Sequence, residues 1–380
     1  MSGRGPVGVG IIGAGNISEE YLSTLTAAPD LRVIAITDLD LDRARAAAVR
    51  YGIGCAASVP ELLADPTVEL VVNLTIPAAH AEVTLQAIGA GKHAWTEKPI
   101  ALNRRAAADV LSAAARAGVL VGNAPDTILG EGIQTSQRLL DGGSIGTPQT
   151  VLTLMQGPGP DAWHPRPQFL FARGAGPLFD IGPYYVTTMV QLLGPIVAVE
   201  ARGHRERTER VIGSGPDAGT TFSVEVDTHL SVLATFASGV IGTSIYSFDS
   251  PLRRQLFEIT GSSGVLRVPV SGFDGATEIL DGDDRETDWR SVPAAGTPRS
   301  RGAGVVDLAR AIRSGTAPRA SGALAGHVLD VLLAIEESAE HGGAVPIAAD
   351  PIRVPALDTE WDPFEATMAR AAAYADEEQS

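Results

Sequence analysis

The sequence predicts two domains: an N-terminal α/β domain with a doubly wound parallel sheet, and a larger C-terminal α+β domain with a large, mostly antiparallel, open-faced sheet. The chain has 380 residues, whereas a single hydrophobic core usually stops growing at roughly 250–300 residues. Residues 7–122 repeat a short β-branched run and then an amphipathic stretch of helix length, which indicates a parallel sheet wrapped by helices. Residues 196–280 instead alternate as antiparallel strands do. We therefore expect domains of residues 1–125 and 126–380.

The elements of the first domain follow from its rhythm. Strands are expected at residues 7–12, 32–37, 69–74, 93–96 and 119–121, with a weak one near 54–56. Helices should start near Asn16, Asp40, Val59, Ala79 and Asn103. Gly52, Gly91 and Gly118 fall where these helices should end, because glycine readily adopts the left-handed conformation found there.

The second domain begins with helices and continues as a sheet. Helices are expected at residues 130–140 and 180–193, separated by a loop at 157–176 that is rich in Pro and Gly. Strands are expected at 222–236, 240–248, 255–260 and 265–268, and further helices at 304–313 and 323–340. One face of this sheet should pack on its own helices, and the other should be apolar, so we expect subunits to associate across it.

Composition and charge exclude several classes of function. Hydrophobic residues make up 44% of the chain and charged residues 19%, as in folded globular proteins. The formal charge of −16 disfavours binding to nucleic acid or to an anionic membrane, because both require clustered Lys and Arg. The basic residues at 202–210 alternate with Glu206 and Glu209, which indicates a solvated strand end or loop.

The N-terminus and the single cysteine bear on location. The apolar run at residues 7–12 is too short for a signal peptide or a membrane span, so a cytoplasmic protein is expected. Cys55 is the only cysteine, so no intrachain disulfide forms. Its apolar surroundings in sequence favour a buried free thiol over a catalytic one.

A glycine-rich loop follows the first expected strand. Residues 10–18 read Gly-Ile-Ile-Gly-Ala-Gly-Asn-Ile-Ser and fit the pattern G-x-G-x-x-G/A with a small Ser in the third position. Gly13 permits the tight turn, Gly15 lets the backbone approach a pyrophosphate, and amides near Asn16 and Ile17 at the helix start bind the anion. An ordinary tight turn in an unrelated α/β domain is the alternative. In this register, the loop indicates a nicotinamide dinucleotide cofactor.

Asp38 ends the second expected strand, about 20 residues beyond the glycine loop, where an acidic side chain would accept hydrogen bonds from the adenosine ribose. An acid at this position favours NAD, because it would repel a 2′-phosphate. The alternative for Asp38 is a helix N-cap, a role that Asp40 and Asp42 also suit. Arg43 lies near enough that NADP stays open.

Three further segments carry a family resemblance. They are Asn73-Leu74-Thr75-Ile76-Pro77 with His80, Gly91-Lys92-His93-Ala94-Trp95-Thr96-Glu97-Lys98-Pro99, and Gly176-Pro177-Leu178-Phe179-Asp180-Ile181-Gly182-Pro183-Tyr184-Tyr185. With them the chain resembles the Gfo/Idh/MocA oxidoreductases over nearly its whole length. The resemblance implies hydride transfer between a nicotinamide cofactor and a secondary alcohol or ketone of a sugar, glycoside or inositol-like polyol. It also implies cofactor contacts at Thr75, Pro77, His80, Glu97 and Lys98, with a purely structural role as the alternative for His80, which should start a helix. A homo-dimer or homo-tetramer is implied as well.

The resemblance implies catalytic roles for Lys98, Asp180 and Tyr184. Lys98 follows a parallel strand, where it would donate to a substrate hydroxyl and stabilise alkoxide character; a solvated Glu97–Lys98 pair is the alternative. Asp180 and Tyr184 are four residues apart on one helix face. Tyr184 would exchange the proton, with Lys98 as the neighbouring cation that favours its ionised form, while Asp180 orients the substrate or Lys98. Core packing is the alternative for Tyr184, although Tyr185 suits that role better.

The loop at 157–176 supplies expected substrate contacts. Trp163 offers an aromatic face for a sugar ring, and His164 offers a hydrogen-bonding group; a packing anchor is the alternative for Trp163. The histidines are dispersed and no Cys/His cluster exists, so no metal site is expected. Two rival functions remain open: a sensing regulator that keeps the dinucleotide fold without chemistry, and a sugar–sugar oxidoreductase that holds its cofactor tightly.

Overall fold

The computed structural model describes residues 5–270, 272–282, 288–349 and 354–368. The chain divides into two compact units, and each is described by itself. The first unit comprises Met1–Gly130, Gly296–Gly326 and Leu357–Ser380, and the second Glu131–Ala295 and His327–Ala356. Two C-terminal segments belong to the first unit, so the second unit is not one continuous stretch of the chain.

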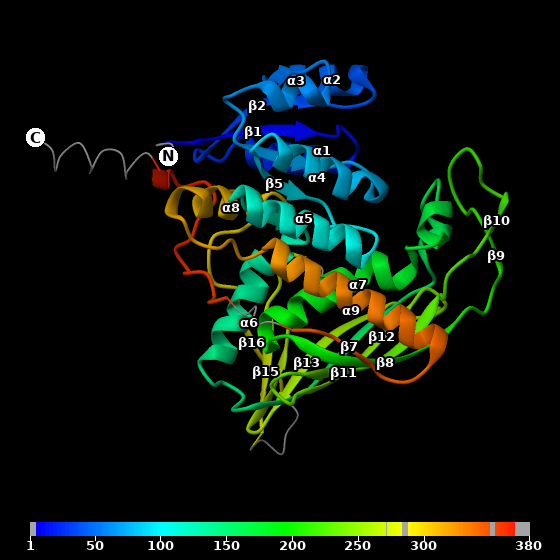
Figure 1. Cartoon of the computed structure of the whole chain (residues 1–380). Helices are drawn as coiled ribbons and strands as arrows, with labels where there is room; N and C mark the ends of the chain where they lie inside the picture. The colour runs from blue at the N-terminus through cyan, green and yellow to red at the C-terminus, as the bar shows by residue number, and fades with distance from the viewer. Residues whose placement is uncertain (1–4, 271, 283–287, 350–353, 369–380) are drawn as a thin grey trace, which may run out of the picture. The chain divides into compact units, whose positions relative to one another are not determined.

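The first unit contains a six-stranded, fully parallel sheet with the strand order β3-β2-β1-β4-β5-β6. Figure 1 labels β1, β2 and β5 of this sheet. Its strands are β1 Val7–Ile12, β2 Leu31–Thr37, β3 Gly54–Cys55, β4 Leu70–Asn73, β5 His93–Thr96 and β6 Val121–Asn123. Every residue of β1 is buried, as expected for a central strand with helices on both faces. The doubly wound parallel sheet predicted from the sequence is confirmed.

Six α-helices accompany this sheet. They are α1 Ile17–Leu25, α2 Leu41–Tyr51, α3 Val59–Ala64, α4 His80–Gly89, α5 Arg104–Ala117 and α8 Ala303–Ser314. Their ends follow local chemistry: the Asp40 carboxylate caps α2 by accepting bonds from the Asp42 and Arg43 amides, and Asn103 caps α5. Gly52 and Gly118 end α2 and α5 in the left-handed conformation, as predicted.

The second unit contains a nine-stranded sheet with the order β16-β15-β14-β13-β7-β12-β11-β8-β17. Its strands are β7 Pro148–Gln156, β8 Ile196–His204, β11 His229–Phe236, β12 Ile241–Ser247, β13 Arg254–Gly261, β14 Gly264–Arg267, β15 Thr277–Asp281, β16 Arg290–Val292 and β17 Val345–Pro346. Neighbours pair antiparallel except β7 and β12, which are parallel. The mostly antiparallel sheet is therefore confirmed, although the central strand β7 was not predicted.

One predicted strand is wrong. Residues 222–236 form two strands, β10 Thr221–Ser223 and β11, which lie in different sheets. β10 pairs with β9 Glu209–Val211 in a separate two-stranded sheet. The intervening residues leave the ladder, and the Val224 amide there donates to the Thr208 carbonyl. Alternation continues through this stretch, so the pattern alone did not reveal the break.

Helices cover one face of the nine-stranded sheet (Figure 1). They are α6 Glu131–Asp141, α7 Gly176–Leu193 and α9 Gly322–His341, the last of which begins in the first unit. α7 packs against β7, β11 and β12. In this core the Tyr185 ring stacks on the Phe257 ring, with 6.3 Å between their centroids, and meets the Tyr246 ring edge-on, with 6.0 Å between centroids. Tyr185 is therefore the packed tyrosine of its pair, as expected.

Two expectations about class and location can be compared with the fold. Cys55 is exposed rather than buried, because the two-residue strand that contains it lies at the sheet edge. The buried-thiol interpretation is therefore wrong. No helix among the described residues is long and apolar enough to cross a membrane.

Candidate active site

The glycine loop between β1 and α1 forms a cradle for an anionic group. Gly13 has φ +109°, and a Cβ there would lie 2.7 Å from the Leu74 carbonyl, so neither the conformation nor the space admits another residue. A Cβ on Gly15 would meet nothing within 4 Å, so space is open beside its backbone. The Gly13 amide is used within the fold, where it donates to Thr37.

Backbone amides at the start of α1 provide the donors. The amides of Gly15, Asn16 and Ile17 have no hydrogen-bond partner within the described chain. Asn16 precedes the helix, and no side chain caps it. Three open amides at a helix N-terminus, beside a glycine that leaves free space, fit the pyrophosphate of a dinucleotide. The loop residues predicted to bind cofactor therefore have a geometry that suits this role.

Asp38 connects the end of β2 to this loop. One carboxylate oxygen accepts the Ala14 amide at 2.6 Å, and the other accepts the Asp40 amide at 2.8 Å. The N-cap of α2 is Asp40, not Asp38. Each Asp38 oxygen retains acceptor capacity, so its position fits a ribose ligand. A hollow of about 390 Å³ lies beside the loop, and Arg43 and Arg50 are among its lining residues.

The segment after β4 is held in place by hydrogen bonds of the buried His80 side chain. His80 is only 1% exposed, and its ring nitrogens lie 2.7 Å from the Pro99 carbonyl and 3.0 Å from the Thr75 carbonyl. The Asn73 amide group donates to the His80 carbonyl. His80 therefore organises the backbone around Thr75 and Pro99. Pro77 begins a short 3-10 helix, Pro77–Ala79, that leads into α4.

Lys98 follows β5 in a segment that several polar groups hold in place. The Glu97 carboxylate accepts the Lys98 amide at 3.0 Å and the Tyr21 hydroxyl at 2.8 Å, while Arg301 lies 3.7 Å away. The Tyr21 oxygen in turn accepts the Trp95 indole at 3.1 Å. Glu97 therefore braces the backbone of the predicted catalytic lysine.

A buried carboxyl lies near this network. The Asp126 side chain accepts the Gly302 amide at 2.8 Å and the Gly304 amide at 3.2 Å. Burial raises the pKa of Asp126 to about 6, although the positive charge of Arg301 opposes the shift. Burial, together with the Glu97 charge, also holds the pKa of Tyr21 well above its ordinary value. The Tyr21 hydroxyl therefore stays a hydrogen-bond donor to Glu97 at neutral pH.

In the second unit, α7 presents the predicted Asp-x-x-x-Tyr pair. Asp180 and Tyr184 are both half-buried, whereas Tyr185 is fully buried. The helix begins at Gly176, four residues earlier than expected, because Pro177 suits a first turn. Asp180 therefore lies within the helix rather than at its start, and one turn separates it from Tyr184 on the same face.

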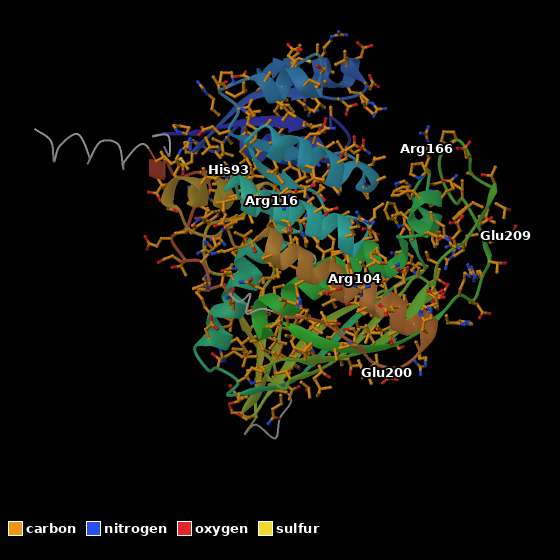
Figure 2. All side chains as sticks on the ribbon, in the orientation of Figure 1. His93, Arg104, Arg116, Arg166, Glu200 and Glu209 are labelled. Atoms are coloured by element: carbon orange, nitrogen blue, oxygen red, sulfur yellow. The ribbon has the colours of Figure 1, made fainter. Side chains whose placement is uncertain are left out.

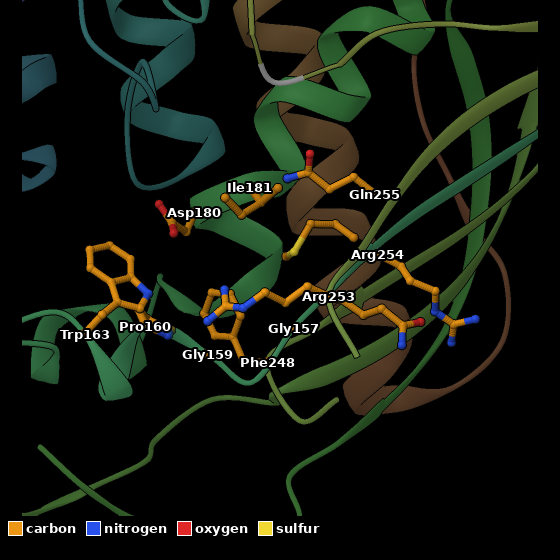
Figure 3. Close-up of a pocket in the computed structure, with 12 residues that line it drawn as sticks. Gly157, Gly159, Pro160, Trp163, Asp180, Ile181, Phe248, Arg253, Arg254 and Gln255 are labelled. Carbon is orange, nitrogen blue, oxygen red and sulfur yellow. The ribbon is translucent and has the colours of Figure 1, made fainter. Parts of the chain in front are cut away.

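A pocket of about 420 Å³ opens beside α7 (Figure 3). It lies where the parallel strands β7 and β12 end and β13 begins, so loops from three strands meet there. Its lining is Met155, Gln156, Gly157, Gly159, Pro160, Trp163, Asp180, Ile181, Phe248, Arg253, Arg254 and Gln255. Two residues predicted from the sequence, Trp163 and Asp180, thus line the same pocket. His164 and Tyr184 are not among the described residues of its lining.

The loop before α7 presents aromatic side chains. Trp163 is 59% exposed. The His164 ring contacts the rings of Trp163 and Phe169 edge-on, with centroid distances of 5.6 and 5.4 Å. The His164 Nδ1 accepts the Arg166 amide, so a neutral His164 carries its proton on Nε2. Arg166 is labelled in Figure 2. Trp163 is therefore not a buried packing anchor, which was the alternative to a sugar-stacking role.

Arg210 holds this loop in place through ion pairs. The solvated environment predicted for it from the sequence is wrong. The sequence suggested a solvated position, yet Arg210 is 4% exposed. Its guanidinium forms ion pairs with Asp161 at 2.7 Å and with Asp249, and it also lies 4.9 Å from the Phe171 ring centroid. Asp161 precedes Trp163, and Asp249 follows Phe248. Arg210 therefore ties together two loops that line the pocket.

Sequence reasoning missed several pocket residues. Arg253 and Gln255 reach the pocket from the start of β13, and Phe248 from the end of β12. An Arg-Arg doublet directly before a predicted strand was the available signal, but nothing local indicated which element it would face. Within the described chain no three His, Cys, Asp or Glu side chains gather as a metal site.

Two family models match the chain. Residues 7–124 match a model described as an oxidoreductase family with an NAD-binding Rossmann fold. Residues 133–267 match the GFO/IDH/MocA C-terminal domain. The first unit is therefore an NAD-binding Rossmann domain, in agreement with the glycine loop and its open amides.

Individual proteins resemble the chain over different lengths. It is 39% identical over 114 residues to 1,5-anhydro-D-fructose reductase of Ensifer adhaerens, a match that covers 30% of this chain and 34% of the reductase. It is 25% identical over 267 residues to myo-inositol 2-dehydrogenase of Thermotoga maritima, a match that covers 67% of this chain and 73% of the dehydrogenase. For the first two curated relatives, the matched stretch covers only about a third of the relative's own length: 29% of one and 34% of the other.

A solved structure of levoglucosan dehydrogenase in complex with NADH and L-sorbose has a TM-score of 0.78 to this chain. The two sequences are 21% identical, and the superposition covers 91% of this chain and 100% of that one. At this identity the likeness shows a shared fold.

Proposed function

The chain belongs to the Gfo/Idh/MocA oxidoreductase family, and on that premise we propose that it transfers a hydride between a nicotinamide cofactor and a secondary alcohol of a sugar, glycoside or inositol-like polyol. The observation that carries this proposal is the pocket in which Trp163 and Asp180 meet. An exposed indole suits the apolar face of a sugar ring, and a carboxylate suits its hydroxyls. The matched reductase and inositol dehydrogenase are named for substrates of the same chemical class.

The cofactor half of the proposal rests on the first unit. Gly13, Gly15, Asn16 and Ile17 would hold the pyrophosphate, and Asp38 the adenosine ribose, which favours NAD. Thr75, Pro77, His80, Glu97 and Lys98 stay proposed contacts to the rest of the cofactor. His80 and Glu97 support this role through the backbone that they hold. When bound, the nicotinamide accepts the hydride.

We assign the proton chemistry to three side chains. Lys98 donates a hydrogen bond to the reacting oxygen and stabilises the negative charge that develops as hydride leaves carbon. Tyr184 takes up the hydroxyl proton as the alcohol is oxidised, and it returns this proton in the reverse reaction. Asp180 orients the substrate hydroxyls. Because Lys98 belongs to the first unit and Asp180 and Tyr184 to the second, their joint action is inferred from their chemistry.

Absorbance of reduced nicotinamide tests the function. Purified protein is mixed with NAD or NADP and a panel of inositols, pyranoses and glycosides, and a rise at 340 nm with any of them is expected. If the protein binds the dinucleotide but no compound of the panel raises the absorbance at 340 nm, the protein is instead a sensor or an enzyme that retains its cofactor. Cofactor found in the purified protein distinguishes the second of these from the first.

Lys98→Met tests the mechanism. We expect turnover to fall at least about a hundredfold, because the charge that stabilises the alkoxide is lost. Cofactor affinity should fall far less, because the glycine loop and Asp38 would still hold the pyrophosphate and the ribose. The matched control is Lys92→Met, which removes the chain's other lysine, whose ammonium bonds only the Asp65 carbonyl among the described residues. Near-normal turnover in the Lys98 variant would contradict the assigned role.

We also propose that the chain forms a homo-dimer or homo-tetramer through the outer face of its nine-stranded sheet. Leu233, Thr243 and Leu152 lie in register on neighbouring strands and face the same side. Leu233 is 53% exposed and Leu152 41%. Glu200, labelled in Figure 2, pairs with Leu233 in the same row.

We propose a cytoplasmic location for this enzyme, because the cytoplasm supplies nicotinamide cofactors.

A further inference from the structure

The charges that line the Trp163 pocket are unequal. The described lining contains one carboxylate, Asp180, and two arginines, Arg253 and Arg254. Most other lining residues are apolar or glycine, so they supply no counter-charge. A neutral sugar ring needs hydroxyl-binding groups but not a guanidinium, whereas a guanidinium with its planar fork of donors matches a carboxylate or a phosphate.

Only one of the two arginines points into the pocket. Successive residues of a strand face opposite sides, and the odd-numbered β13 residues Phe257 and Ile259 are buried beneath the helices. Arg253, just before the strand, shares their side. In Figure 3 the Arg253 side chain extends toward Phe248, Gly159 and Pro160, whereas the Arg254 side chain points away from them.

Among the described residues, no carboxylate forms an ion pair with Arg253. Within the described chain it has neither an ion pair nor a side-chain hydrogen bond. The two acidic residues in the adjoining loops, Asp161 and Asp249, are both bound to Arg210, whose side chain is 2% exposed. Thr228 also donates to Asp249. The local acids are thus already paired, and the charge of Arg253 is left facing the cavity.

We propose that Arg253 binds an anionic group of the substrate, so that the enzyme acts on a sugar or polyol that carries a carboxylate or a phosphate. This inference rests on the proposed function and narrows its substrate class. Trp163 contacts the ring, Asp180 binds hydroxyls, and Arg253 holds the anion. The volume of about 420 Å³ suits one sugar ring with such a group, since small-ligand pockets measure roughly 300–1,000 Å³.

The anionic group takes no part in bond changes. The substrate's secondary C–H gives a hydride to the oxidised nicotinamide, its O–H proton passes to Tyr184, and a ketone and reduced nicotinamide result. Arg253 therefore contributes to substrate binding and orientation, and its loss should affect recognition of the acid far more than chemistry on a neutral sugar.

Paired ligands test this assignment. Titration calorimetry, with NAD present, compares D-glucuronate and D-glucose 6-phosphate with D-glucose; initial rates of NADH formation are measured with the same three compounds. We expect one of the two anionic sugars to bind at least about tenfold more tightly than glucose, and Arg253→Gln to remove this preference, because a charged bidentate hydrogen bond is lost. Arg207→Gln, the matched control, removes an exposed arginine that does not line the pocket and should keep the preference. Which anion is preferred separates carboxylate from phosphate.

Each failure has its own signature. Equal or tighter binding of glucose in the wild-type protein, no binding of either anionic sugar, or a preference that survives Arg253→Gln would overturn the assignment. Turnover of neutral polyols without any preference for acids would overturn it and leave the proposed function intact. Binding of an anionic sugar that depends on Arg253, without NADH formation from any compound, would instead support the anion site and contradict the dehydrogenase function.

Discussion

Asp126 shows how burial sets the charge of a single residue. It is fully buried, and its carboxyl accepts hydrogen bonds from the backbone amides of Gly302 and Gly304. Its pKa of about 6 in the folded state lies above the ordinary value of 3.8. The folded protein therefore holds a proton that the unfolded chain releases between about pH 4 and pH 6. In this window the Asp126 contribution to stability falls as pH rises, by up to about 3 kcal/mol once both states are ionised.

Asp126→Asn should remove this pH dependence. Denaturant unfolding is measured for the variant and the wild type at several pH values from 4 to 7.5. The free energy of unfolding of the variant relative to the wild type should rise from about pH 4 to pH 6 and then level off. The slope matters rather than the absolute value, because the substitution also alters two hydrogen bonds. Asp109→Asn, at an exposed carboxylate of α5, should give a flat difference; a flat difference for Asp126→Asn as well would contradict the raised pKa.

Among the elements, those defined by local chemistry were predicted best. The strands of the parallel sheet were found to within one or two residues, because the helices between them have clear ends, such as the N-cap Asp40 and the C-terminal Gly52 of α2. β7 was missed because its apolar residues face both sides: Val151 is buried, yet Leu152 is 41% exposed. Its position between β12 and β13 depends on distant pairing that a local pattern does not contain.

Arg210 illustrates an element-level contact that sequence could not disclose. It lies among exposed charged residues, and only the folded two-stranded sheet turns its side chain inward to meet Asp161 and Asp249. Arg210→Met would leave two mostly buried carboxylates without a cation, which costs roughly 3–5 kcal/mol. We therefore expect a clear fall in melting temperature, together with looser loops around Trp163.

Kinetics separate this positioning role from simple destabilisation. At a temperature where the Arg210→Met variant is folded, KM for the sugar substrate should rise several-fold, while KM for the dinucleotide, which binds in the other unit, should not change. The matched control, Arg207→Met, removes an exposed arginine from the same segment and should alter neither. A lowered melting temperature with an unchanged sugar KM would show that Arg210 is merely structural.

For the whole molecule, sequence motifs point to the candidate site residues of each unit but not to the other residues that line the pocket. The glycine loop, the Lys98 segment and the Asp180 helix each carry a continuous motif, so they were identified without a structure. Arg253 lies more than 70 residues beyond Asp180 in the chain, and only the order of β7, β12 and β13 brings it to the same pocket. The return of residues 296–326 to the first unit was likewise hidden, since it depends on contacts such as the 2.8 Å ion pair of Arg310 with Asp30.

Association through the sheet is the prediction that concerns the assembled molecule. Leu152 and Leu233 lie in one row on the outer face of the nine-stranded sheet, and replacing both with Lys would bury unpaired charges in any interface formed there. Light scattering after size-exclusion chromatography should show two or four times the chain mass of 39.4 kDa for the wild type and a smaller mass for this double variant. Leu39→Lys, at a fully exposed leucine of the first unit, should keep the wild-type mass. A monomeric wild type would contradict association, whereas a folded double variant of unchanged mass would place the interface on another surface.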